Sequence, residues 1–394
     1  MYYDLKKGKF EIDQASKVLF QEALKLRPKN SKEPIIVCFD DSITPKFGKS
    51  FESVALLHDH AKHNGKEYTN GHCFVCAIIL MPIMKNGKKK YIRIPFQVIM
   101  WKPEDEQASN GKTATKLELA TRILSELRKE LDDDIELLAQ CDAWYSKGPV
   151  IQLVKDHKNV QMNAAVRVDT VLYELPSDKT GQRGRPPLKG EKIVNFSTFE
   201  FHDVPKSNLK IASKKVKTRL FGLDRVVLAI VTMTADGSSK RLFLCTDLNL
   251  MEKFGTSFID DAETRGLVKK HPDLLAYYIY LLRWNIEILF YELKTFWNFG
   301  DYKVLSATAI ERLLNTICVT YAVMTLLPHL SEGWAYMSDM SIQERRDEVK
   351  RVLNREIILG QFLAEMRKDP KLQGSAKDCE EFARKRSFIS THVS

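Results

Sequence analysis

The chain has 394 residues, of which 44% are hydrophobic and 28% are charged. This balance is typical of a folded protein with two or three structural units, and it excludes a largely disordered chain. The 61 Lys and Arg residues outnumber the 51 Asp and Glu residues, which gives a net charge of +10 and a pI of about 9.0. A basic protein favours an anionic partner such as nucleic acid, although many basic proteins bind none.

The N-terminus and the cysteines bear on the compartment. The first ten residues lack the apolar core of a signal peptide, and no later run approaches the ~20 apolar residues that span a bilayer. We therefore expect a soluble cytoplasmic protein with no membrane partner. Seven scattered cysteines form no disulfide pattern, which is typical of a reducing compartment. Cys73 and Cys76 form a CxxC, but no second ligand pair follows, so zinc is not expected.

The first half of the chain follows an α/β order. Apolar residues first recur at helical spacing, and three β-rich runs separated by Lys/Gly/Asn-rich turns then indicate a meander. A helix, a strand that ends at Asp142, a second helix and a fifth strand follow. The predicted helices are 13–27, 113–131 and 148–157, and the predicted strands are 34–39, 72–81, 91–101, 135–142 and 160–168.

The second half changes character twice. From Asp169 to Asp247, short β-like segments alternate with basic turns, and Asp236-Gly237 provides a hairpin connection. We therefore expect an inserted β domain. The remainder has helical patterns at 272–297, 306–327 and 342–367. The expected fold class is α/β: a mixed sheet flanked by helices, interrupted by a β-rich insertion, with helical N- and C-terminal segments.

The helix predicted at 272–297 is apolar almost all round, so we expect it to be largely buried. Four of its polar residues share one stripe about 60° wide, if each residue turns the helix by about 100°. They are Tyr280, Arg283, Glu287 and Lys294. Buried charges are costly unless they pair or face a ligand or cleft. The alternative to a functional site is an internal ion pair between Arg283 and Glu287, four residues apart.

Two acidic positions elsewhere stand at strand ends. Asp40, followed by Asp41, leaves the run PIIVCF, and Asp142 follows LLAQC. One strand-end Asp by itself is usually a turn or helix cap. Together with Glu287, Asp40 and Asp142 supply three carboxylates that can converge on two Mg²⁺ ions. Such ions activate the attacking oxygen and stabilise the leaving oxygen in phosphodiester chemistry.

Three motifs in order carry a resemblance to a known family. The spacing Tyr280-x2-Arg283-x3-Glu287-x6-Lys294 matches the Tyr-Arg-Glu-Lys signature of bacterial insertion-sequence transposases of the insertion-sequence-four type. Asp40-Asp41-Ser42 resembles that family's Asp-x-Ser/Thr motif, and Asp142-Ala143-Trp144-Tyr145 resembles its second motif. The resemblance runs from about residue 35 to about residue 330. It implies a DDE transposase with an RNase H-like core and a β-rich insertion between the second Asp and the Glu.

The resemblance also implies roles for the acidic residues. Asp40, Asp142 and Glu287 would be the catalytic metal ligands for Mg²⁺, with Mn²⁺ able to substitute. Asp41 is the rival for Asp40, which we prefer because it leaves the strand and fits the Asp-x-Ser spacing.

The remaining signature residues would contact the phosphates of the transposon ends: Tyr280, Arg283 and Lys294. Arg183 and Arg185 lie in an RGRPP run whose composition resembles arms that enter the DNA minor groove, and a solvated basic loop is the alternative. Trp297 could stack on an exposed base or simply pack at the end of its helix.

The expected function is cut-and-paste transposition by a homodimer assembled on double-stranded DNA, both transposon ends and target, in the cytoplasm at the nucleoid. The alternatives are an RNase H-fold nuclease that cannot join strands and a catalytically disabled DNA-binding regulator. Only 39 residues precede Asp40, fewer than such transposases usually use for DNA binding, which leaves a truncated or inactivated copy open. The expected divisions are an N-terminal helical segment (1–33), the first part of the core (34–170), the insertion (171–250), the closing helices of the core (251–330) and a C-terminal helical region (331–394).

Overall fold

The computed structural model describes most of the chain. The described residues are Leu5, Lys7, 12–29, 31–48, 50–59, Gly65, 67–103, 114–176, 187–368 and Lys377. The chain divides into two compact units, Met1–Cys318 and Val319–Ser394. Every predicted site residue that the structure describes lies in the first unit.

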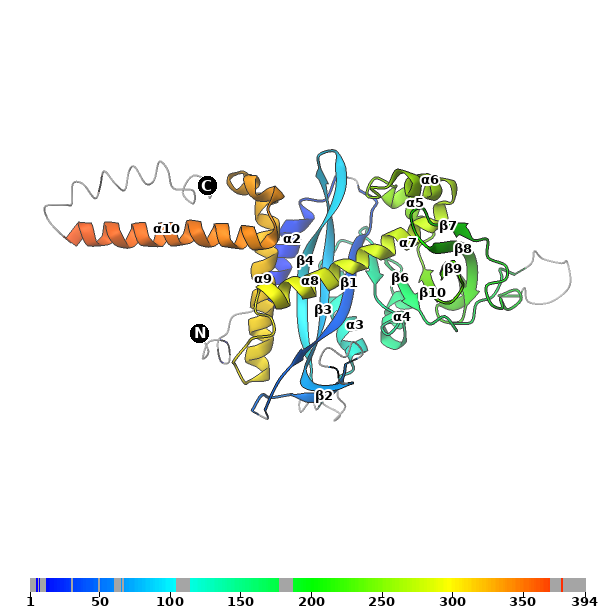
Figure 1. Cartoon of the computed structure of the whole chain (residues 1–394), viewed down its shortest axis with the longest axis horizontal. Helices are drawn as coiled ribbons and strands as arrows, with labels where there is room; N and C mark the ends of the chain where they lie inside the picture. The colour runs from blue at the N-terminus through cyan, green and yellow to red at the C-terminus, as the bar shows by residue number, and fades with distance from the viewer. Residues whose placement is uncertain are drawn as a thin grey trace. The chain divides into compact units, whose positions relative to one another are not determined.

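A mixed sheet of ten strands organises the described part of the first unit (Figure 1). The order across the sheet is β2-β3-β1-β5-β6-β10-β9-β8-β7, and β4 also pairs with β3. β1, β5 and β6 are parallel, and the other pairs are antiparallel. The strands are β1 (Ile35–Pro45), β2 (Ala55–His58), β3 (Tyr68–Lys85), β4 (Lys88–Trp101), β5 (Leu137–Gln140), β6 (Val160–Val166), β7 (His202–Asp203), β8 (Leu209–Thr218), β9 (Gly222–Thr234) and β10 (Lys240–Cys245).

The helices differ in how they relate to the two units. α9 (Ala307–Leu330) begins in the first unit and ends in the second, which also contains the 3-10 segment η3 (Glu332–Asp339) and α10 (Ile342–Lys368). The other helical elements belong to the first unit. They are α2 (Ile12–Leu24), α3 (Lys116–Lys129), α4 (Gly148–Asp156), α5 (Leu250–Phe254), α6 (Ala262–Lys270), η1 (Pro272–Leu274), α7 (Leu275–Tyr280), η2 (Leu281–Arg283) and α8 (Trp284–Phe296).

The centre of the sheet is covered on both faces. The start of β1 is a buried apolar run, and all of β5 is buried and, except for Gln140, apolar, as expected for parallel strands between layers of helices. Figure 1 shows α8 lying across β1, which it contacts, and α3 also contacts β1. Successive side chains of a strand point to opposite faces. Asp40 of β1 pairs with Arg283 at the start of α8, and Asp41 pairs with Lys116 of α3, so these helices cover opposite faces.

The elements predicted for the first half of the chain are confirmed, with two differences: β1 continues six residues past its predicted end at 39, and β2 was not predicted. The three β-rich runs form β1, β3 and β4, which are antiparallel neighbours as a meander requires. The predicted helix near 113–131 begins with a capping box, in which Thr115 accepts from the backbone of Glu118 and Glu118 accepts from the backbone of Thr115. Local sequence signals therefore suffice for these elements.

The single helix predicted at 272–297 is wrong in two respects. It is not largely buried, because Trp284 and Tyr291 are 63% and 62% exposed and only four of the thirteen residues of α8 are buried. Nor is it continuous. It is divided into η1, α7, η2 and α8, with a 3-10 turn at Leu281–Arg283. A 3-10 turn advances by about 120° per residue rather than about 100°, so the stripe calculated for a continuous helix does not hold across it. Tyr280 lies before this turn, whereas Arg283 and Glu287 lie at its end and beyond it.

The predicted β-rich segment forms strands, but they continue the sheet. β10 is antiparallel to β6, from Leu242 opposite Val166 to Cys245 opposite Asn163, and β9, β8 and β7 follow outward. The hairpin predicted at Asp236-Gly237 connects β9 and β10. Its status as a separate inserted domain stays a prediction.

The expectation that no run is long and apolar enough to cross a bilayer is wrong for α9. Among the described residues this is the one helix that meets the requirement of length and composition, and half of its most apolar stretch is buried. A core helix of a soluble protein passes the same test.

Candidate active site

Asp40 and Asp142 lie just beyond the parallel pairing of β1 with β5. The prediction that Asp40 ends its strand is wrong: β1 continues to Pro45, because its residues from Asp40 to Pro45 stay paired with β3. The last residues paired between β1 and β5 are Cys38 and Gln140, and Asp40 and Asp142 each stand two positions further along their chain. Because β1 and β5 are parallel, residues that stand equally far past the last pair lie side by side, so the two aspartates are neighbours. Burial, followed by the negative charge of Asp142, raises the pKa of Asp40 to about 7. The two carboxylates therefore lie close enough for the charge of Asp142 to disfavour ionisation of Asp40.

Arg283 joins the helical acid to Asp40. Its Nη1 donates to Asp40 Oδ2 at 2.9 Å and to Glu287 Oε1 at 3.4 Å. Only 13% of the Arg283 side chain is exposed, so the guanidinium is held between the two acids and largely away from water. Burial alone would lower the pKa of Arg283, but Tyr280 and the three carboxylates raise it. We call Asp40, Asp142 and Glu287 the carboxylate cluster.

Asp142 also shapes its own loop. Its Oδ1 accepts hydrogen bonds from the backbone N–H of Trp144 at 3.0 Å and of Tyr145 at 3.2 Å. Such bonds are the usual task of a strand-end Asp at a turn. Asp142 therefore does cap a turn, as the alternative interpretation predicted. The same turn keeps its carboxylate close enough to Asp40 to raise the pKa of that residue.

Asp41 points to the opposite face of β1, where its carboxylate has three donors. Oδ1 accepts from the Tyr145 hydroxyl at 2.9 Å. Oδ2 accepts from Lys116 Nζ at 2.8 Å and from Cys73 Sγ at 3.1 Å. The structure therefore brings Asp40 together with Glu287 and uses Asp41 to hold the Tyr145 loop against α3.

The other signature residues surround the cluster in different ways. The Tyr280 ring packs on Phe243, with centroids 4.7 Å apart, and its centroid lies 5.9 Å from Arg283 Cζ. Burial raises the pKa of Tyr280 to about 12. Lys294 Nζ donates to the carbonyl oxygen of Ile43 at 3.0 Å, so this ammonium lies against β1 beyond Asp40.

Of the remaining predicted DNA contacts, one is buried and two lie outside the described residues. Trp297 is 9% exposed, which favours the packing alternative over stacking on a base. Arg183 and Arg185 lie outside the described residues. Sequence reasoning gave no role to Lys147, although aromatic and basic residues together in the second motif, DAWYSK, were a usable signal. It also gave none to Lys116, which lies in a separate helix and outside that motif.

The cluster must rearrange to hold a metal ion. Within the part of the chain that the structure describes, no three His, Cys, Asp or Glu side chains are grouped so as to bind one. The reason is visible at Arg283, whose guanidinium contacts Asp40 and Glu287 and supplies the positive charge between them. Carboxylate oxygens are nevertheless the ligands that Mg²⁺ prefers. The three side chains therefore supply suitable donor atoms, and metal ligation by these residues stays a prediction.

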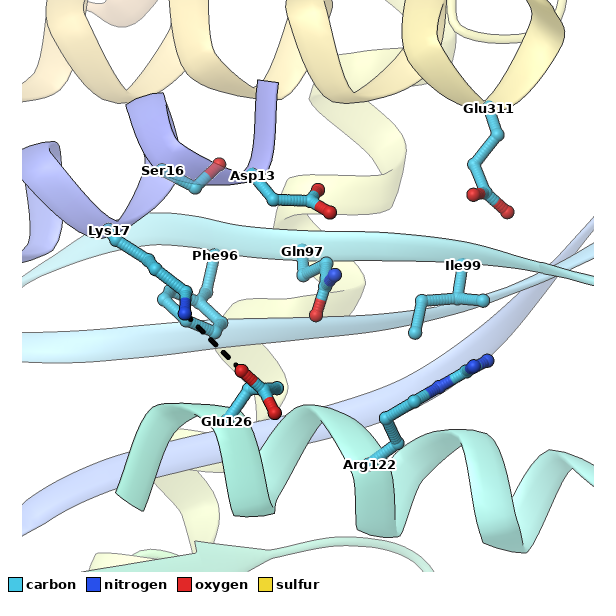
Figure 2. A pocket seen from close by; sticks show the side chains of 9 residues that line it. All are labelled: Asp13, Ser16, Lys17, Phe96, Gln97, Ile99, Arg122, Glu126 and Glu311. Atoms are coloured by element: carbon cyan, nitrogen blue, oxygen red, sulfur yellow. Dashed lines mark hydrogen bonds and ion pairs between the residues drawn. The ribbon is translucent and has the colours of Figure 1, made fainter. Parts of the chain in front are cut away.

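A separate pocket of about 320 Å³ lies among α2, β4, α3 and the start of α9 (Figure 2). Figure 2 shows Lys17 of α2 reaching toward Glu126 of α3, with a separation of 3.3 Å. Glu311, from α9, accepts a hydrogen bond from the backbone N–H of Met100 at 2.8 Å, and burial raises the pKa of its carboxyl. None of the cluster residues lines this pocket, and its charged groups take part in packing.

A family model described as DDE superfamily endonuclease matches residues 1–219 of the chain. The match covers more than half of the 394 residues, includes Asp40 and Asp142, and ends before Glu287. Endonucleases of this superfamily generally use divalent metal ions and act on DNA. No match to the chain is found among curated proteins.

Proposed function

We propose that this chain, which belongs to the DDE superfamily endonucleases, is a transposase that cuts DNA at the ends of a mobile element and joins those ends to target DNA. The proposal includes an RNase H-like core. Its support is the order β4-β3-β1-β5-β6, in which β4, β3 and β1 are antiparallel and β1, β5 and β6 are parallel, as such a core requires.

The observation that carries the proposal is the position of the carboxylate cluster. Its members come from β1, the loop after β5, and α8, which are far apart in the chain. Asp40 is linked to Glu287 through Arg283, and the charge of Asp142 acts on Asp40. Three neighbouring carboxylates are poorly explained by stability, because like charges placed together, one of them on the largely buried Asp40, raise the free energy of the folded state.

The cationic residues suggest how DNA would be held. When bound by the cluster, Mg²⁺ or Mn²⁺ would activate the attacking oxygen and stabilise the leaving oxygen. The guanidinium of Arg283 would then leave Asp40 and Glu287 and bind a phosphate of the DNA, because it is a bidentate donor suited to phosphate oxygens. Lys294, further along the same helix, would hold the next part of the backbone as a point charge.

A strand-transfer assay tests the proposal. Labelled DNA from the segments that flank the coding frame is incubated with a target plasmid, Mg²⁺ and the protein. The wild type should produce joined products, and Asp142→Ala and Glu287→Ala should not. Asp260→Ala is the matched control, because Asp260 is an exposed acid paired only loosely with surface lysines.

Each outcome of this assay separates the candidates. Joining that survives Asp142→Ala or Glu287→Ala would defeat the assignment of the cluster. Cleaved ends without joined products would support a nuclease of the same fold. DNA binding without any Mg²⁺-dependent cleavage would support a disabled regulator.

We also propose that the protein acts as a homodimer on DNA, because one event must bring two element ends to one target site. Light scattering of the protein with and without end-containing DNA measures the assembly. A cleavage-competent complex that contains one copy of the chain would contradict the dimer.

A further inference from the structure

The second acidic motif continues directly into an exposed aromatic residue. Trp144 is 40% exposed, whereas its neighbour Tyr145 is fully buried. The hydrogen bond from the Trp144 backbone to Asp142 Oδ1, at 3.0 Å, connects the two residues of one turn. The indole is therefore anchored beside one member of the carboxylate cluster, and its position follows that of Asp142.

Tyr145 makes this anchor rigid. Its ring packs edge-on against Phe39, with centroids 5.4 Å apart, and its hydroxyl donates to Asp41. The indole of Trp144 lies 4.9 Å from the Tyr145 ring at 73°. One side of the indole thus rests on a buried support while the remainder is open to solvent. A surface already held in place loses little conformational freedom when a planar ligand stacks on it.

Two ammonium groups lie near this indole. Lys147 Nζ is 4.6 Å from the ring centroid, and Lys116 Nζ is 5.5 Å from it. Lys116 is paired with Asp41 at 2.8 Å and is therefore held in position. Lys147 is exposed at the start of α4. An exposed cation–π contact is weak, so an incoming phosphate can take up the Lys147 ammonium at little cost.

An exposed aromatic residue alone indicates nothing, because single exposed apolar side chains are common. Trp144 differs because Lys147 Nζ lies 4.6 Å from its ring centroid and its backbone N–H donates to Asp142 of the proposed active site. Surfaces that bind single-stranded nucleic acid combine these two features, an aromatic face for the base and a cation for the backbone. A base within a duplex is stacked on its neighbours and offers no free face.

We propose that Trp144 and Lys147 bind one unpaired nucleotide of the DNA, next to the phosphate on which the carboxylate cluster acts. The inference rests on the proposed function and deepens it. The nucleobase stacks on the indole, and the phosphate of the same nucleotide pairs with the Lys147 ammonium. The site therefore selects DNA whose end is frayed or overhanging over a blunt duplex of equal length.

Binding without metal tests the site independently of catalysis. The probes are a blunt duplex and the same duplex with a short overhang that carries 2-aminopurine, both in EDTA. Trp144→Ala should weaken binding of the overhang probe by about tenfold or more, because stacking of one base contributes at least that much. It should change binding of the blunt probe less than about twofold and should abolish quenching of the 2-aminopurine.

Variants that preserve the fold sharpen the test. Trp144→Phe should retain most of the affinity and quenching, since it keeps an aromatic face. Lys147→Ala should weaken binding of the overhang probe and should reduce the slope of the logarithm of its affinity against the logarithm of the salt concentration by about one. Tyr68→Ala is the matched control: Tyr68 is 53% exposed at the start of β3, eight residues along that strand from the Cys76 that pairs with Asp40, and should show no selective loss.

The outcomes distinguish this site from the proposed function. Equal loss of binding to both probes in Trp144→Ala, or the same selective loss in Tyr68→Ala, would overturn the nucleotide site. A wild type that cleaves and joins DNA while Trp144→Ala binds both probes normally would overturn the site and leave the transposase intact. If the protein binds the overhang probe selectively through Trp144 but never cleaves DNA, the nucleotide site would be supported and the proposed function contradicted.

Discussion

Replacing Asp40 by asparagine tests the electrostatics of the carboxylate cluster in the absence of metal. Burial and then the charge of Asp142 raise the pKa of Asp40 to about 7, against an ordinary value of about 3.9. A carboxyl with a higher pKa in the folded protein holds its proton more tightly when folded, so stability falls as the pH rises from about 4 to about 7. At about 1.4 kcal/mol for each pKa unit, ionising Asp40 costs about 4 kcal/mol above that range.

Asparagine cannot ionise, so Asp40→Asn should remove this dependence. Between about pH 5 and about pH 8.5, the wild type should lose about 3 kcal/mol of unfolding free energy through Asp40, and the variant should not. Urea denaturation in EDTA at the two pH values measures the difference. Asp41→Asn is the matched control. It should retain the pH dependence but lose about 1–3 kcal/mol at both values, because Lys116 keeps its charge without its carboxylate partner.

The same pH dependence in the wild type and Asp40→Asn would refute the reasoning. It would mean that Asp40 ionises in the folded protein as it does in the unfolded chain, which is incompatible with a buried position beside Asp142. Loss of the pH dependence in Asp41→Asn instead would mean that the two aspartates have the opposite roles.

Three further substitutions have defined outcomes. Asn315→Ala should destabilise the protein by about 2–4 kcal/mol in urea denaturation, because the amide satisfies both the N–H and the C=O of Val98; a smaller cost than about 1 kcal/mol would contradict this. Gly71→Ala should lower the melting temperature at a cost of about 1–3 kcal/mol, since the new Cβ would lie 2.4 Å from the Thr44 carbonyl oxygen, and unchanged melting would show that the strands shift freely. Arg283→Gln should tighten Mg²⁺ binding by the DNA-free protein, measured by calorimetry, because the guanidinium contacts two of the proposed ligands; unchanged or weaker binding would argue against that competition.

Local sequence patterns predict the position of Asp142 and only part of that of Asp40. Continuous apolar runs identify β1 and β5 as buried strands, and Asp142 follows β5 as predicted. β1 instead continues through Asp40 to Pro45, because it stays paired with β3 after its pairing with β5 has ended. The choice between Asp40 and Asp41 could not be made in this way. It depends on which face of β1 meets α8, and that is set by packing between segments far apart in the chain.

The contacts of the cluster were harder to predict for the same reason. The ion pair between Arg283 and Glu287 follows from helical spacing, but the shorter contact from Arg283 to Asp40 is tertiary. The 3-10 turn at Leu281–Arg283 leaves no recognisable signal in an apolar run. Burial of Trp297 and exposure of Trp144 likewise depend on neighbours that periodicity does not identify.

The pairing of β10 with β6 has a mechanical consequence. The strands that follow outward from β10 are connected to the rest of the sheet through a row of backbone hydrogen bonds. A pull on β8 or β9 along the strand direction loads these bonds in shear, all at once, rather than bending a flexible hinge. Tension applied there is therefore transmitted to β6 and on to β5, the strand that leads to Asp142.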